Sequence, residues 1–239
     1  MGEFLRSFIT AIPADLSSEE AKRLKQAIQL FPEEAVYIYS FKEGKMLYAS
    51  GWEEVLGYKD DEINLPIVLY TTTPEYAPFS EEFNEKALQF ILNKTEELEK
   101  YSFVMELKKI HKNGHTVPII SKVGVFSSEN GTVTAIIGRF QVSHSIKLGK
   151  VMRYAAYGPD KSSFEEELNK QLFHYYAISG KEKEALSLVA RGYSFKEVAN
   201  YFKVSQSAIE KRIIPMYKRF DVKSLTHLIS FAHDNHILE

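Results

Sequence analysis

Two kinds of hydrophobic pattern divide the chain. Between Ala35 and Val142, several short segments alternate apolar and polar residues with a period of two. This pattern predicts half-buried β-strands. In the rest of the chain, apolar residues recur every third or fourth position, as in Phe164, Leu168 and Leu172, which predicts amphipathic helices. The fold class expected is an α+β domain, with an antiparallel sheet and flanking helices, followed by an all-α domain.

Turn residues separate the expected strands. Asn113-Gly114 and Asn130-Gly131 are hairpin signals, because both residue types tolerate positive φ. They predict an antiparallel meander after a first hairpin and a set of helices. The expected strands are Ala35–Phe41, Lys45–Ser50, Tyr101–His111, His115–Ser128 and Thr132–Val142, with a helix from about Ser80 to Lys100 before the third.

Serine-glutamate pairs three residues apart predict the starts of helices, since each can form a reciprocal capping box. Four such pairs are interpreted in this way: Ser17 with Glu20, Ser162 with Glu165, Ser179 with Glu182, and Ser194 with Glu197. The first opens a helix to Phe31 and the second a helix to about Tyr176. A further helix is expected from Ser143 to about Tyr157. The expected domains are an N-terminal helical extension (1–31), an α+β domain (32–143), a helical linker (144–176) and an all-α domain (177–239).

The two short helices expected at Ser194–Phe202 and Ser205–Phe220 have the proportions of a helix-turn-helix. In that motif the N-terminal part of the second helix meets base edges in DNA. The second helix carries Pro215, which removes one backbone hydrogen bond and predicts a kink. The kink would come about two turns after the helix start, so the first turns can still form.

The segment from Gly180 to Val222 resembles the LuxR-type (GerE family) DNA-binding domain. The resemblance rests on these residues: Glu182-Lys183-Glu184, Leu186, Val189, Gly192, Ser194, Lys196, Glu197, Val198, Ala199, Val204-Ser205 and Arg219-Phe220-Asp221-Val222. It implies that the second helix is a recognition helix, and that the last helix, Ser224–His236, supports dimerisation. A packing role inside the domain is the alternative for that last helix.

The chain departs from the family where DNA contact is expected. Ala208-Ile209-Glu210-Lys211-Arg212 stands where the family usually has Thr-Val-Lys-x-His, so an acidic residue replaces a lysine. Glu210 could accept a hydrogen bond from cytosine or weaken the attraction to phosphate. The candidate DNA-binding residues are Ser194, Lys196, Ser205, Gln206, Ser207, Glu210, Lys211, Arg212 and Lys218.

Residues 32–143 resemble a PAS domain in the order of their strands and helices. The resemblance rests on the helical segment Gly51–Ile63 with its Gly57-Tyr58 pair, on the hairpin around Asn113-Gly114, and on a final strand ending at Ser143. It implies a sensor that holds a ligand or a partner against a curved sheet. The residues expected to line a ligand site are Tyr37, Tyr39, Trp52, Phe90, Phe103, Met105 and Ile120, with core filling as the alternative.

Composition limits the chemistry. The chain contains no cysteine, which excludes disulfides, thiolate metal sites and cysteine adducts of flavin. The expected helix at 80–100 has no histidine to ligate a haem, and His111 and His115 flank a turn and are interpreted as solvated. No cofactor or metal is therefore assigned, and a small organic ligand stays open. No catalytic motif is present, so an enzyme is not expected.

Charge is unevenly distributed along the 239 residues. Residues 175–239 carry 10 Lys+Arg against 7 Asp+Glu, a net +3, whereas the remainder carries 20 against 25, a net −5, which together give −2. A basic C-terminal part suits contact with a polyanion. No apolar run approaches the ~20 residues of a membrane helix, and the N-terminus lacks a signal-peptide pattern.

The sequence therefore predicts a one-component bacterial transcription regulator. It would be a cytoplasmic homodimer, without a membrane partner, that binds double-stranded DNA under the control of its sensor. The alternative is a protein-interaction or dimerisation module whose helix-turn-helix has lost DNA binding. Glu210 and Pro215 favour this alternative.

Overall fold

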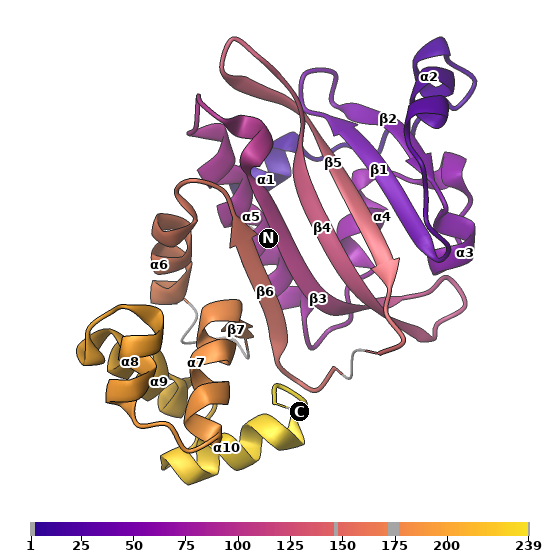
Figure 1. The fold of residues 1–239 in the computed structure, drawn as a ribbon. Coiled ribbons are helices and arrows are strands. Elements are labelled where there is room, and N and C mark those ends of the chain that lie inside the picture. Colours follow the sequence, from indigo (N-terminus) through magenta and orange to yellow (C-terminus); the bar gives the residue numbers. More distant parts are fainter. Residues whose placement is uncertain (1–2, 146–147, 172–176, 239) are drawn as a thin grey trace.

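The computed structural model describes residues 3–145, 148–171 and 177–238. A single twisted sheet occupies the first two thirds of this part of the chain, and a group of helices follows at one end of it (Figure 1). The sheet has the strand order β2-β1-β5-β4-β3-β6-β7. Its strands are β1 (Glu34–Ser40), β2 (Lys45–Ser50), β3 (Ser102–Ile110), β4 (Thr116–Glu129), β5 (Thr132–Val142), β6 (Met152–Tyr157) and β7 (Ala177–Ser179).

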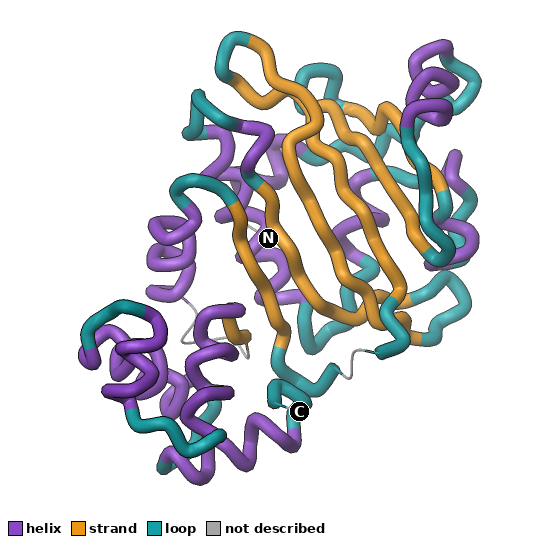
Figure 2. Tube along the Cα trace, viewed as in Figure 1, coloured by secondary structure: helices purple, strands orange, loops and turns teal. Residues whose placement is uncertain are grey.

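Helices cover the two faces of the sheet unequally (Figure 2). One face packs against most of the helices in a large apolar core. On the other face α2 packs through Ala21 in a smaller cluster with residues of β1, β2 and β5, such as Val36, Leu47 and Ala135. The helical elements of this part are α1 (Glu3–Phe8), α2 (Glu19–Ala27), α3 (Trp52–Leu56), η1 (Asp60–Glu62), α4 (Leu65–Tyr70), α5 (Ala77–Leu92), η2 (Leu98–Lys100) and α6 (Lys161–Gln171).

The five predicted strands are confirmed, and so are their turns. β4 pairs antiparallel with both β3 and β5. Gly114, with φ of +94°, closes the first of these hairpins, and Asn130 and Gly131, both with positive φ, close the second. The physical cause is the one that the sequence indicated, since asparagine and glycine adopt left-handed backbone conformations at little cost.

Met152–Tyr157 forms β6, and the helix predicted for Ser143–Tyr157 is wrong. β6 pairs antiparallel with β3, which places Tyr154 opposite Met105 and Arg153 opposite Glu106. Met152, Tyr154 and Ala156 alternate into the core, a period-two signal that the prediction missed. The exposed edge of β3 supplies unpaired backbone groups, and these stabilise a strand there.

Several helix boundaries differ from the predictions, and α2 ends at Ala27 instead of Phe31. Ser18, not Ser17, caps α2, because Ser17 instead donates its hydroxyl to Asp15 at 2.6 Å. Predicted cap Ser162 lies inside α6, which begins at Lys161. α5 ends at Leu92, and η2 is a separate turn before β3, whereas one helix to Lys100 was expected. The predicted end at Tyr176 lies outside the described residues.

An aromatic cluster attaches α6 to the sheet core. The ring of Phe164, 2% exposed, lies 5.0 Å from that of Phe103 and 5.7 Å from that of Phe83, measured between centroids. Phe90 also packs on Phe164, at 5.2 Å. Residues between the last hairpin and the C-terminal helices are therefore part of the sheet domain's core.

Four helices complete the described chain and surround a second core. The four helices are α7 (Gly180–Ala190), α8 (Phe195–Phe202), α9 (Gln206–Arg219) and α10 (Leu225–Asp234). Val151 and Ile178 from the sheet side join this second core. β7 runs parallel to β6 and leads directly into α7, so the helical group continues from the edge of the sheet.

Buried charges join β7, α7 and α9. The guanidinium Nη1 of Arg219 lies 3.0 Å from a carboxylate oxygen of Glu182, and it donates to the Ala177 carbonyl at 3.0 Å. Both side chains are almost completely buried, at 2% and 5% exposed. Ser179 N–H donates to the same carboxylate at 2.8 Å, which completes the predicted capping box of α7.

Within the described residues, none of the helices combines the length and the apolar character that crossing a bilayer requires.

Candidate functional site

The helices α8 and α9 are fixed by their caps. Ser194 accepts from Glu197 N–H at 3.3 Å, and the Glu197 carboxylate accepts from the Ser194 N–H at 2.8 Å. The Ser194 hydroxyl also donates to that carboxylate, at 2.7 Å, and the hydrogen bonds from the hydroxyl and from the N–H of Ser194 lower the pKa of Glu197. Lys203, with φ of +54°, ends α8, and Ser205 caps α9 by accepting from Ala208 N–H at 3.2 Å. A three-residue turn therefore separates two capped helices, one residue longer than the predicted boundaries leave because Ser205 is the cap of α9 and not its first helical residue.

Helix α9 has a buried face and an exposed face. Ile209, Ile213 and Met216 are completely buried. The opposite face carries Ser207, Lys211, Ile214 and Lys218, at spacings of four, three and four residues, and all four are exposed. We call these four residues the α9 stripe. Pro215 lies within the helix, which nevertheless continues to Arg219.

Glu210 lies on the flank of the α9 stripe. It is half-buried, and its carboxylate accepts a hydrogen bond from the Gln206 side chain at 2.9 Å. The two residues are four apart on one helix, where such pairs are neighbours. The acidic group is thus engaged by Gln206 and stands beside the outward-facing lysines.

Arg212 lies on the other flank, against α8. Its guanidinium carbon is 5.4 Å from the centre of the Phe202 ring, a cation–π contact. Its Nη1 is buried, without a hydrogen-bond partner in the described part of the chain. Unlike Lys211, Arg212 therefore packs between the two helices.

The structure brings most of the predicted DNA-binding residues onto one surface. Ser207, Lys211 and Lys218 lie on the α9 stripe, and Gln206 and Glu210 lie beside it. Three more of the predicted residues are exposed at the starts of α8 and α9, namely Ser194, Lys196 and Ser205. Arg212 is the exception, since it packs between the two helices.

Sequence reasoning missed three exposed residues of this surface. Ile214 is 51% exposed on the α9 stripe, and Tyr201 is 64% exposed near the end of α8. Lys203 is exposed in the turn. Helical phase could have found Ile214, because it is seven residues from Ser207 and therefore shares its face.

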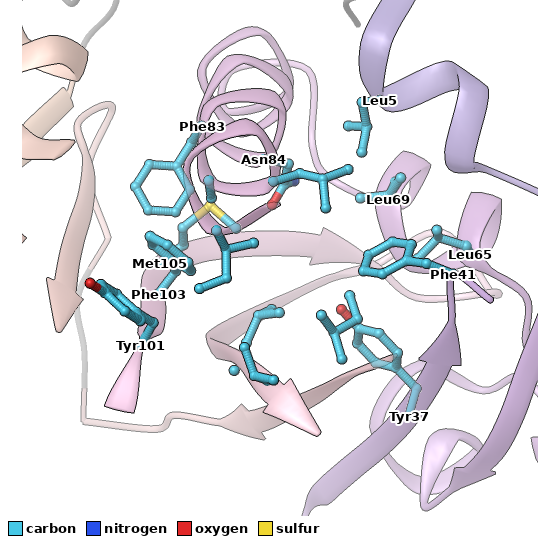
Figure 3. Close-up of a pocket in the computed structure, with 17 residues that line it drawn as sticks. Leu5, Tyr37, Phe41, Leu65, Leu69, Phe83, Asn84, Tyr101, Phe103 and Met105 are labelled. Atoms are coloured by element: carbon cyan, nitrogen blue, oxygen red, sulfur yellow. The ribbon is translucent and has the colours of Figure 1, made fainter. Parts of the chain in front are cut away.

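A cavity of about 70 Å³ lies in the sheet domain between α5 and the sheet (Figure 3). Its wall is almost entirely apolar, and Asn84 points into it from α5. A water-sized group needs about 10–15 Å³, so the cavity has room for roughly five such groups. The lining residues are Leu5, Tyr37, Phe41, Leu65, Leu69, Phe83, Asn84, Ala87, Leu88, Ile91, Tyr101, Phe103, Met105, Val123, Gly124, Val125 and Ile136.

Three of the residues predicted to line a ligand site do line this cavity: Tyr37, Phe103 and Met105. The remaining four are placed elsewhere. Tyr39 donates its hydroxyl to the Phe8 carbonyl at 2.6 Å, and Trp52 donates its indole N–H to the Val36 carbonyl at 2.9 Å. Phe90 packs on Phe164, and Ile120 lies in the β4 position between inward-facing Ile119 and Ser121.

A buried lysine lines a second, smaller cavity of about 20 Å³ that shares wall residues with the first. Lys109, 3% exposed, donates to the Val68 carbonyl at 2.6 Å and to the Thr72 hydroxyl at 2.8 Å. Burial lowers its pKa from 10.5 to about 7. The sequence did contain a signal for it, because Phe103, Met105, Leu107 and Lys109 share the inward phase of β3.

Replacing Lys109 by methionine should remove a pH dependence of stability. The folded pKa lies below the unfolded one, so the unfolded chain binds more protons between about pH 7 and 10.5, and stability rises with pH in that window. Lys109 contributes a slope of up to about 1.4 kcal/mol per pH unit. Urea unfolding at pH 7, 8 and 9 should show a flatter rise for Lys109→Met; parallel profiles would contradict the burial of a titrating amine.

The geometry defines a two-part protein, a cavity-bearing α+β sheet domain followed by a capped helix pair with an exposed basic stripe. Among the described residues, no group of three or more histidine, aspartate or glutamate side chains could hold a metal ion. Comparison with models of protein families finds no match. Comparison with curated proteins finds none either.

Comparison with solved structures finds distant similarities. One is to the Vibrio cholerae VqmA dimer in the absence of target DNA, at 15% identity over 90% of this chain and 88% of that chain, with a TM-score of 0.36. Another is to a phage VqmA–DPO complex, at 16% identity over 93% and 92%, with a TM-score of 0.37. A third is to a PAS domain from Colwellia psychrerythraea, at 19% identity over 53% and 98%, with a TM-score of 0.40. Similarities this distant carry no argument about what this chain binds.

Proposed function

We propose that this chain is a transcription regulator whose C-terminal helix-turn-helix, of the LuxR type, binds duplex DNA under the control of a PAS-like sensor domain. The observation that carries the proposal is the α9 stripe, an exposed face with two lysines on the second helix of a capped helix pair. In this class of motif such a helix enters the major groove. The proposal includes no catalytic activity.

The charge and the caps support this assignment. Lys211 and Lys218 lie about two turns apart on the α9 stripe, and Lys196 of α8 and Lys203 of the turn are exposed as well. Lysines placed in this way contact phosphates and set the register of a helix on the duplex. Gln206 and Ser207 occupy the first turn of α9, where side chains reach base edges.

Control by the sensor requires a connection between the cavity and α9. Phe103 and Met105 line the cavity from β3, β3 pairs with β6, and β6 pairs with β7. β7 continues into α7, whose Glu182 is paired with Arg219 of α9. A ligand acts through this connection only if it favours one arrangement of the two parts over another.

We further propose that the chain acts as a cytoplasmic homodimer. Two copies would place their α9 helices in successive major grooves, about 34 Å apart. A change in the sensor would then alter the spacing of the two helices and with it the affinity for DNA. The sequence of the operator would reflect the two-fold symmetry of the dimer.

Reversing both lysines of the α9 stripe tests the proposal. The double variant Lys211→Glu/Lys218→Glu should bind random duplex DNA at least about 100-fold more weakly, and its log affinity should fall less steeply with log salt, because two phosphate contacts are lost. Fluorescence anisotropy across a salt series measures both quantities.

The matched control is Arg23→Glu/Lys25→Glu, which changes the charge equally on exposed residues of α2. It should retain most of the affinity, because α2 lies on the sheet domain away from the helix pair (Figure 1). Equal losses in both double variants would mean that net charge, and not the α9 stripe, governs binding.

A protein-interaction module is the second candidate. Ile214, half-exposed in the middle of the α9 stripe, and Glu210 beside it favour a protein partner over phosphate. This candidate predicts no measurable duplex binding even at low salt, and no retention on heparin. Ile214→Ser would then disrupt the assembly without changing the net charge.

A further inference from the structure

Lys109 is a buried amine with one hydrogen-bond position free. Its Nζ donates to Val68 and Thr72, and it lies 5.2 Å from the centre of the Phe140 ring. An ammonium group has three N–H donors. Within the described part of the chain, two of them have oxygen acceptors and the third has none.

No carboxylate in the surrounding wall compensates this amine. The wall is formed by Val68 and Leu69 of α4, Ser80 and Asn84 of α5, Tyr37 of β1, Met105 and Leu107 of β3, Ser121 and Val123 of β4, and Phe140 of β5. Tyr37 is the other titratable side chain among them, and burial raises its pKa, so it is neutral. Desolvation alone lowers the pKa of Lys109, and no charged neighbour raises it. A buried cation without a counter-charge is costly.

The space beside Lys109, about 20 Å³, lies next to the apolar cavity and shares part of its wall. Tyr37, Leu69, Asn84, Met105 and Val123 line both spaces. Figure 3 shows Asn84, Phe83 and Met105 directed into the apolar part. The combined site therefore has one basic end, with the hydroxyl-bearing Ser121 and Ser80 nearby, and one apolar end against α5.

We infer that the cavity takes a small weak organic acid, whose ionised acidic group pairs with Lys109 and whose apolar body lies between α5 and the β3–β4 strands. This inference rests on the proposed sensor role and names the class of ligand. An anion supplies the missing acceptor and the missing counter-charge in one contact. The size of the cavity restricts the body to a short branched chain or one small ring.

Binding of such an acid takes up a proton. In the empty site at pH 8 the amine is mostly neutral, since its pKa is about 7. An ionised acid beside it favours the ammonium form and raises that pKa. Each anion bound at pH 8 should therefore be accompanied by nearly one proton from solution.

Calorimetry with matched probes tests the inference on the full chain. The probes are 3-methylbutanoate and benzoate, each compared with its uncharged amide of nearly equal shape. At pH 8 the acids should bind at least about 10-fold more tightly than the amides. Titrations in two buffers of different ionisation enthalpy should give an uptake of nearly one proton. Equal affinity for acid and amide, no binding by any of the probes, or no proton uptake would overturn the inference.

Two variants assign the effect to the buried amine. Lys109→Met should abolish the preference for acids, whereas the matched control Lys108→Met, on the outward phase of β3 beside Glu75, should keep it. An acid preference that survives in Lys109→Met overturns the inference. Circular dichroism establishes that the variant is folded, and if it is not, the acid–amide comparison and the proton uptake of the unaltered chain decide.

Duplex binding, measured separately, distinguishes this inference from the proposed function. Acid binding with Lys109 dependence but without any affinity for duplex DNA would sustain the inference and overturn the regulator. Duplex binding that depends on the α9 stripe, with no acid preference, would overturn the inference alone.

Discussion

Replacing Arg219 by methionine is expected to lower the unfolding free energy by about 3–5 kcal/mol, the usual cost of leaving one member of a buried ion pair without its partner. The Glu182 carboxylate would stay buried, with only the N–H and hydroxyl of Ser179 as donors. The Ala177 carbonyl would also lose the hydrogen bond from the guanidinium. Urea unfolding followed by circular dichroism measures the loss.

A double-mutant cycle separates the ion pair from the loss of packing. Glu182→Gln alone should also be destabilising, because it leaves the guanidinium buried without its counter-charge. The double variant Glu182→Gln/Arg219→Met should recover part of the summed loss, which is the coupling expected of contacting residues. Strict additivity of the two single changes would contradict the direct pairing of Glu182 with Arg219.

Replacing Phe164 by alanine should have a comparable effect on the sheet domain. The ring is 2% exposed and contacts the rings of Phe83, Phe90 and Phe103, so truncation removes buried apolar surface and leaves a cavity. Such changes cost about 3–5 kcal/mol. Thermal unfolding should show a large decrease in Tm.

Phe164→Leu provides the matched control, because it keeps most of the apolar volume and should cost distinctly less. A small effect of Phe164→Ala would mean that α6 is held in place by other contacts. The outcome also bears on the sensor, since Phe83 and Phe103 line the cavity as well as contacting Phe164.

The helix pair was accurately predictable because its signals are local. The capping box at Ser194 and Glu197, and the cap at Ser205, involve residues three apart in sequence and need no distant partner. The buried face of α9 follows from helical spacing alone. The hairpin turns at Gly114 and Gly131 have the same local origin.

Distant contacts explain what was missed. β6 depends on the free edge of β3, nearly fifty residues earlier, and the alternation of six residues does not reveal which distant edge they pair with. β7 likewise exists through its pairing with β6. The ligand-site predictions correctly identified residues of β1 and β3 that line the cavity. Tyr39, Trp52 and Phe90 are aromatic as well, but in the folded structure they make other contacts.

The sequence by itself determined the α+β and all-α division, the meander, the capped helix pair and the phase of the α9 stripe, because each depends on backbone preferences and periodicities within a few residues. Only the tertiary structure decided that Arg212 packs on Phe202, that Arg219 pairs with Glu182, and that Lys109 lies beside the cavity between α5 and the sheet. These features result from burial. A buried charged group loses its contact with water, so its free energy depends on the few protein groups that surround it. Which neighbours remain depends on segments brought together from distant parts of the chain.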